Sequence, residues 1–206
     1  MVAELFAVKI FAGDGEALVK GGGHDYRITL ADLEASGIAD GCEISEETLA
    51  FLTTAEEKLR CIKKSFTYLA YKGHSVRALA QKLKRSGFSD AAIEASVVLL
   101  EKKGYLDDYA LCAEYAVAIQ RQKGYGVLRI KKELYAKGFD RDCIEAAVSE
   151  LEETPEGLVT EILKKRFPHL DPEDRQARAK ATAYLAARGY DYDEINNAIS
   201  AFKEEE

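Results

Sequence analysis

A repeat with a period of 51 residues organises this chain. Three glycine–aromatic pairs recur at that spacing: Gly87-Phe88, Gly138-Phe139 and Gly189-Tyr190. A leucine precedes each glycine by four residues, and an isoleucine follows it six residues later. Self-similarity at a fixed period indicates a tandem architecture in which each unit is one supersecondary motif. Stacked units present an extended surface, so we expect a binding protein rather than an enzyme.

Each repeat reads as three helices. In the first, the capping-box spacing of Thr54 and Glu57 predicts a long helix that begins at Thr54 and ends before Gly73. A second helix is expected over 75–85, and a third, capped by Ser89 or Asp90, ends at residue 104. The glycine of each pair is a candidate left-handed C-cap. We expect the aromatic residue after it to pack on the core of its own repeat.

The second and third repeats have the same expected order of helices, but different residues begin and end those helices. In the second, Asp107 or Asp108 is expected to cap helix one, and two glycines at 124 and 126 separate helices one and two. In the third, Pro155 is expected to open helix one, and Pro168 and Pro172 bound the following loop. Asp191 and Glu194 have the spacing of a further capping box.

The N-terminal part has a different pattern. Residues 5–11 and 26–30 are rich in β-type residues, and two glycine turns, at 13–15 and 21–23, separate them. We predict two or three short strands, a short helix over 30–36 stopped by Gly37, and a second short helix after Ser45. The predicted fold is mainly α. Four parts are expected: a β-containing extension over 1–53 and three-helix repeats over 54–104, 105–153 and 154–206.

Charge is distributed unevenly along the chain. The net charge is −7, yet residues 59–104 carry 10 basic against 3 acidic residues, and 119–141 carry 7 against 2. Residues 1–58 hold 4 basic and 12 acidic residues. The middle of the chain is therefore a cationic island in an acidic protein, which makes it a candidate surface for a polyanion such as a phosphate backbone.

The candidate contact residues come from this island. Those of repeat one are Lys63, Lys64, Lys72, Arg77, Lys82, Lys84 and Arg85, and those of repeat two are Arg121, Lys123, Arg129, Lys131, Lys132 and Lys137. For any one of them, a solvated helix face is the simpler interpretation. Four tyrosines, at 68, 71, 105 and 115, lie around the island and could stack on bases, but we expect helix-packing roles for them.

Other site chemistry is sparse. The four cysteines form no C-x-x-C pair and are expected to be small, mostly buried thiols of a reducing compartment. The three histidines are dispersed, the triple glycine at 21–23 lacks the lysine of a phosphate-binding loop, and the adjacent aspartates at 107 and 108 suit helix capping. We expect no catalytic residue, cofactor, metal or membrane span, and a cytoplasmic monomer.

The order and spacing of several segments resemble the RecX family of recombination regulators. They are Gly104-Tyr105-Leu106-Asp107-Asp108, then Tyr115, the run from Lys123 to Ile130, Glu133-Leu134 and Lys137-Gly138-Phe139. Repeat one agrees through Ser75, Leu79, Leu83, Gly87-Phe88 and Ile93. Residues 26–49 look like a short β-containing extension that some members carry. The resemblance covers roughly residues 24–203 and is strongest over 59–152.

The resemblance implies a non-enzymatic modulator of the RecA recombinase in DNA recombination and repair. Family members are tandem three-helix repeats that lie along the RecA–DNA filament, inhibit strand exchange and ATP hydrolysis, and can bind DNA. Arg129 matches a recurring family position and can make bidentate contacts. The third repeat departs from the pattern because it lacks the basic helix two and has the proline loop.

Two other functions remain open on the residues alone. Three-helix units with a glycine turn resemble helix-turn-helix elements, so the chain could be an autonomous DNA-binding module. Stacked helical repeats also serve many protein partners, so it could be an adaptor for another protein. An enzymatic role is the weakest alternative, since the sequence offers no catalytic constellation.

Overall fold

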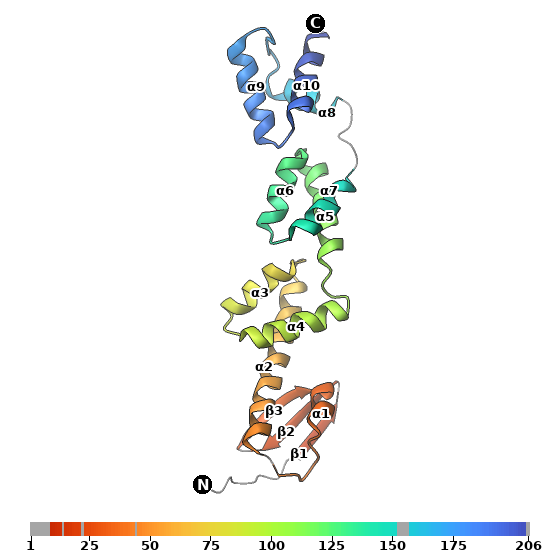
Figure 1. The fold of residues 1–206 in the computed structure, drawn as a ribbon, viewed down its shortest axis with the longest axis vertical. Coiled ribbons are helices and arrows are strands. Elements are labelled where there is room, and N and C mark those ends of the chain that lie inside the picture. Colours follow the sequence, from red (N-terminus) through yellow and green to blue (C-terminus); the bar gives the residue numbers. More distant parts are fainter. Residues whose placement is uncertain (1–8, 14, 22, 44, 152–156, 205–206) are drawn as a thin grey trace. The chain divides into compact units, whose positions relative to one another are not determined.

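The computed structural model describes residues 9–13, 15–21, 23–43, 45–151 and 157–204. In this part of the chain three strands are followed by ten helices (Figure 1). The chain divides into two compact units, Met1–Leu106 and Asp107–Glu206. The first holds the sheet and repeat one, and the second holds repeats two and three. The predicted mainly α fold with a small N-terminal α/β extension is confirmed.

The N-terminal strands form one antiparallel sheet. Strands β1 (Lys9–Gly13), β2 (Glu16–Gly21) and β3 (His24–Thr29) pair in sequence order. The strands are connected at the expected glycine turns. Asp14 and Gly22 of these turns, and residues 5–8 of the predicted first strand, lie outside the described residues. Alternate residues of β2 and β3 point to one face, where the pairs Ala17–Ile28 and Val19–Tyr26 are buried.

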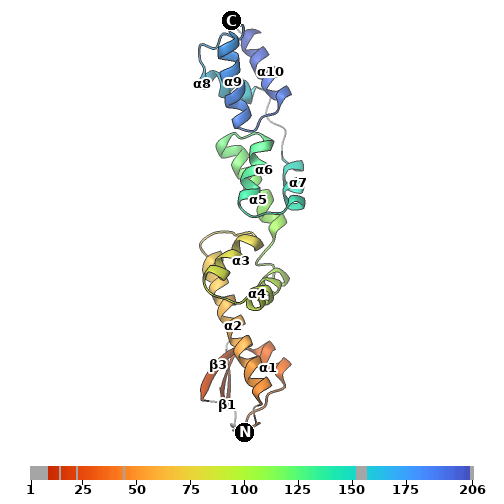
Figure 2. The same ribbon diagram turned by 60° about the vertical axis from the view of Figure 1, so that its left-hand side comes forward.

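Two helices cover this buried face of the sheet (Figure 2). Helix α1 (Leu30–Ser36) is capped by the Thr29 hydroxyl and ends at Gly37, which has φ +64°, as predicted. Helix α2 (Glu46–Leu69) begins after Ser45, whose hydroxyl accepts from the Thr48 N–H. Leu52 and Ala55 of α2 complete the core over the sheet.

The predicted helix start at Thr54 is wrong. Residues 46–69 form one continuous helix, and the Thr54 hydroxyl donates to the Ala50 carbonyl at 3.0 Å inside it. A threonine that bonds back to the preceding turn cannot serve as an N-cap. Near the end of the same helix, Phe66 is 39% exposed and meets Tyr105 edge to face. The expected boundary between residues 53 and 54 falls within α2, and the four-part division stays a prediction.

Repeat one packs α2 against α3 (Val76–Arg85) and α4 (Asp90–Lys102). Its core joins Cys61 of α2, Leu79 and Leu83 of α3, and a set of α4 residues that includes Ile93. Ser75 is the N-cap of α3, and Ser89, one of the two caps that the sequence offers, is the N-cap of α4. Repeat one is therefore complete only with the C-terminal half of a helix whose other half covers the sheet.

Repeats two and three repeat this three-helix plan. Repeat two contains α5 (Asp108–Lys123), α6 (Val127–Ala136) and α7 (Arg141–Ser149), and Asp107 is the cap of α5. Repeat three contains α8 (Leu158–Arg166), α9 (Arg175–Ala187) and α10 (Tyr192–Glu204). The expected opening of helix one by Pro155 lies outside the described residues. The capping box at Asp191 is confirmed, with reciprocal hydrogen bonds to Glu194 of 2.8 Å each.

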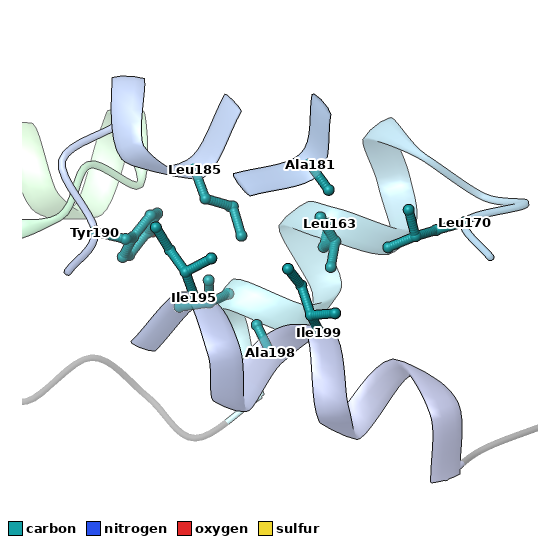
Figure 3. Close-up of a cluster of buried hydrophobic side chains, with 9 residues drawn as sticks. Leu163, Leu170, Ala181, Leu185, Tyr190, Ile195, Ala198 and Ile199 are labelled. Atoms are coloured by element: carbon teal, nitrogen blue, oxygen red, sulfur yellow. The ribbon is translucent and has the colours of Figure 1, made fainter. Parts of the chain in front are cut away.

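The glycine–aromatic pairs form the corner between helices two and three of each repeat. The three glycines have φ values of +87°, +93° and +88°. The backbone N–H of the aromatic residue after each glycine donates to the carbonyl of the leucine four residues before that glycine. Phe139 and Tyr190 are almost fully buried, and Phe88 is partly buried against its core. In Figure 3, Tyr190 and Leu170 lie at opposite ends of the core of repeat three. The predicted packing role of the aromatic residues is confirmed.

Within the second unit, the corner of repeat three meets the turn between α5 and α6. The N–H of Gly126 donates to the Arg188 carbonyl at 3.0 Å, and the N–H of Leu128 donates to the Gly189 carbonyl at 3.1 Å. The Arg188 guanidinium donates to the carbonyls of Lys123 and Gly124. A Cβ on Gly126 would lie 2.3 Å from the Gly189 oxygen, so only glycine fits here.

Substitution of Gly189 by alanine should destabilise the protein more than the same change at Gly87. Both glycines have positive φ, which costs an alanine about 1–2 kcal/mol. At Gly189 the new Cβ would also lie 2.2 Å from the Arg129 backbone nitrogen, whereas nothing lies within 4 Å at Gly87. We expect a further loss of about 1–3 kcal/mol at Gly189. Urea unfolding of G87A and G189A measures the loss of unfolding free energy in each variant. Equal losses would contradict the close contact between Gly189 and Arg129.

Candidate functional site

The candidate cations of repeat one lie on two helices and the turn between them. Lys63 and Lys64 are on α2, Lys72 is in the turn, and Arg77, Lys82, Lys84 and Arg85 are on α3. Helix α3 buries Leu79 and Leu83, so its charged residues remain on the outward faces. All seven are exposed except Lys82, which is half-buried. The cations of repeat one are therefore exposed to solvent, and their role as contact residues stays a prediction.

Tyr68 holds part of this basic surface in place. The ammonium groups of Lys64 and Lys82 lie 5.2 and 4.8 Å from its ring centroid. Its hydroxyl lies 2.8 Å from the Ser86 hydroxyl, and its ring packs in the core of the repeat. Cation–π contacts of this kind orient long side chains at small cost. The expected packing role is correct for Tyr68.

His74 is buried beneath the same cluster. Its Nε2 atom lies 3.2 Å from the Lys82 ammonium group. Burial lowers the pKa of His74, and the positive charges of Lys82 and Lys72 lower it further. A neutral imidazole can accept a hydrogen bond from Lys82, whereas an imidazolium would repel it. His74 thus helps to orient a lysine of the basic surface while it stays uncharged.

Ion pairs divide the candidate cations into two groups. In unit one, Lys63 pairs with Glu16 at 2.8 Å and Lys84 with Asp90 at 2.9 Å. In the same described part of the chain, Lys72, Arg77 and Arg85 have no carboxylate partner. Surface ion pairs contribute little to stability, but each pair cancels local charge. The unpaired cations therefore carry most of the attraction of this surface for an anion.

Repeat two shows the same division. Arg129 pairs with Glu133 at 2.9 Å, and Lys131 pairs with Glu145 at 2.6 Å. Lys123 lies 3.8 Å from Glu133, so this one carboxylate serves two cations. Lys132 on α6 is exposed and makes no ion pair in the part of the chain that the structure describes. Arg129, the arginine that the sequence favours, is therefore partly neutralised, which sequence spacing did not indicate.

Several cations of the second unit lie over aromatic rings. The Arg188 guanidinium lies 5.4 Å from the Tyr125 ring and 5.6 Å from the Tyr184 ring. Lys123 and Arg129 also lie over Tyr125, at 5.4 and 5.5 Å. Lys137 lies 4.0 Å from the Tyr115 ring. These contacts restrain Lys123, Arg129 and Lys137 of repeat two. Arg121, the remaining candidate, is exposed on the last turn of α5.

Two features escaped the sequence analysis. Tyr71, for which helix packing was expected, is 87% exposed and lies beside the unpaired Lys72. Repeat three, for which no basic helix two was expected, carries Arg175, Arg178 and Lys180 on α9 and three further cations in the last turn of α8. Residues 153–206 hold 12 acidic residues, so the net charge of the whole repeat hides these cations. Only a charge count over a segment shorter than the repeat would have found them.

The structure offers little for catalysis or metal binding. Among the described residues no group of three or more histidines, cysteines, aspartates and glutamates could hold a metal ion. The cysteines are free thiols, and Cys61, Cys112 and Cys143 are buried. Burial raises the pKa of Cys112 to about 11 and that of Cys143 to about 12, so neither is a thiolate at neutral pH. No described helix is long and apolar enough to span a membrane.

Comparison with known proteins identifies each repeat separately. Models of the first, second and third three-helix domains of RecX match residues 61–98, 107–148 and 157–199. A regulatory protein RecX of Stenotrophomonas maltophilia strain R551-3 is 33% identical over 66% of this chain and 83% of its own length. One of Vibrio parahaemolyticus is 33% identical over 67% of this chain and 88% of its own.

Solved structures show the same fold. A crystal structure of a regulatory protein RecX superposes with a TM-score of 0.79 at 21% identity and covers 97% of this chain and 99% of that one. A RecX from Lactobacillus salivarius gives a TM-score of 0.64 at 22% identity and covers 73% of this chain and 99% of that one. The coverage of the first match includes the N-terminal sheet.

His74 should make the protein less stable as the pH falls from 7.5 to 5.5. Its pKa in the folded protein lies below the unfolded value of 6.5, so the unfolded state binds more protons in this range and stability rises with pH. We expect the variant H74Q to show a flatter dependence of the urea-unfolding free energy on pH. His24 and His169 are unchanged in both proteins, so parallel pH profiles would contradict the buried, neutral imidazole.

Proposed function

Because the chain belongs to the RecX family of regulatory proteins, we propose that it binds the RecA recombinase filament on single-stranded DNA and restrains it. Membership in this family confirms the prediction of a regulator rather than an enzyme. The inhibited activities would be ATP hydrolysis and strand exchange. The protein would act in the cytoplasm as a monomer, with no membrane partner.

The observation that carries the proposal is the set of exposed, unpaired cations on the helix-two faces. Arg77 and Arg85 on α3 and Lys132 on α6 have no carboxylate partner in the described chain, while neighbouring cations do. A surface with uncompensated positive charge attracts the phosphates of a nucleic acid and releases their counterions. A RecA–DNA filament offers such phosphates in its groove, together with protein surface.

The proposed mechanism is occupancy of the filament groove. The repeats would contact successive RecA protomers, with the basic faces of α3 and α6 toward the DNA. Exposed apolar residues on α6 would contact protein, since Leu128 and Tyr135 lie on either side of Lys132 along one helix face. A protein bound in this way obstructs entry of a second DNA strand and the movement between protomers that ATP turnover requires.

Autonomous DNA binding is the second candidate function, and the exposed Tyr71 favours it. A solvent-exposed tyrosine next to an unpaired lysine can stack on a base while the lysine contacts a phosphate. This function predicts binding to single-stranded DNA without RecA and a steep loss of affinity with salt. The third candidate function is an adaptor for another protein. It predicts no binding to single-stranded DNA, no salt-dependent affinity for DNA and no effect on RecA.

The first test is the ATPase rate of the cognate RecA on single-stranded DNA with the protein added below equimolar amounts. We expect a strong reduction at low ratios, because one bound molecule affects several protomers. No reduction up to equimolar protein, with active RecA, would contradict the proposal. DNA binding at two salt concentrations would then distinguish the DNA-binding module from the adaptor.

Reversing the unpaired cations should weaken this inhibition. We expect the triple variant R77E/R85E/K132E to need about tenfold more protein for half-inhibition, because three phosphate contacts become repulsive. The matched control is K102E/K103E/R141E, which makes the same change of charge at exposed cations outside α3 and α6. Equal effects of the two triple variants would show that net charge, and not these helix faces, governs binding.

A further inference from the structure

An open cavity of about 330 Å³ lies in repeat three, where α8 ends and α9 begins. Its lining includes Arg166, Phe167, His169, Asp174, Gln176 and Lys180. The proline loop between the helices forms part of the wall through Pro168. The proline loop of this repeat thus helps to shape the cavity.

Positive charge dominates the lining. Arg166 and Lys180 are exposed and make no ion pair in the part of the chain that the structure describes. The one carboxylate of the lining belongs to Asp174, which already accepts the backbone N–H of Gln176 at 2.8 Å as the cap of α9. Two free cations against one hydrogen-bonded carboxylate favour an anionic ligand.

Arg166 is held in place before any ligand binds. Its guanidinium lies 5.6 Å from the Phe167 ring and 5.9 Å from the Tyr184 ring. These two rings meet edge to face at 5.6 Å, so they form a rigid platform. Stacking restrains the arginine while its N–H groups stay free for a planar, bidentate contact. A restrained arginine loses less conformational entropy when it binds a phosphate.

We propose that this cavity binds the phosphate group of a nucleotide. Arg166 would contact two phosphate oxygens, Lys180 would supply the second charge from α9, and the side-chain amide of Gln176 would donate a further hydrogen bond. Phosphate groups of this kind occur in a nucleic-acid strand and in a free nucleotide. Binding here does not require RecA, so it can be tested on the isolated full-length chain.

The test follows the backbone amide resonances of the full-length chain by NMR during titration with three probes. The probes are inorganic phosphate, ATP without magnesium and short oligothymidylate. We expect at least one nucleotide probe to shift resonances of residues 166–180. Shifts with oligothymidylate alone identify a nucleic-acid strand as the source, and shifts with ATP identify a free nucleotide. If no probe shifts these resonances, the proposal is wrong.

Variants establish which side chains bind. K180Q should reduce the affinity for the binding probe about tenfold, since a hydrogen bond to a charged group is lost. R166Q should reduce the affinity by a similar factor. R166K keeps the charge but not the planar fork, so its affinity should lie between those of the unchanged protein and R166Q. The control K165Q removes an exposed charge next to Arg166 that does not line the cavity. A loss in K165Q equal to that in K180Q would overturn the proposal.

Discussion

The helices that the glycine–aromatic corners join are short, and they depend on those corners. Helices of 9 to 13 residues are marginal in water, so each is stable only when its apolar face is covered by its neighbours. The glycine of each corner lets the chain reverse, and the aromatic residue that follows fills the space between helices two and three. The exposed cations of α3 and α6 are therefore positioned by helices that these corners hold together.

The sequence predicted these corners well because they depend on local chemistry. Positive φ favours glycine, and Ser75, Ser89 and Asp107 cap helices through bonds to residues three positions away. It failed at Thr54, where the capping-box pattern occurs in the middle of a helix. There the sheet decides the structure, since Leu52 and Ala55 cover its apolar face and keep the helix continuous through the motif.

The candidate surface could be predicted only in outline. Spacing indicates which helix carries each lysine, but pairing depends on tertiary contacts, as between Lys63 and Glu16, 47 residues apart, or Lys131 and Glu145. These contacts decide which cations remain available. The cations of α8 and α9 in repeat three were missed for a different reason, because along the sequence they are averaged with many acidic residues.

Helix α2 has a consequence for how the N-terminal unit unfolds. Its first half covers the sheet and its second half belongs to repeat one, with no break between them. Loss of either core would leave one half of the helix without its packing partners, and helix propagation is cooperative along an unbroken hydrogen-bonded segment. The sheet and repeat one therefore form a single cooperative unfolding unit, in which the amide protons of both parts exchange with solvent through the same opening event.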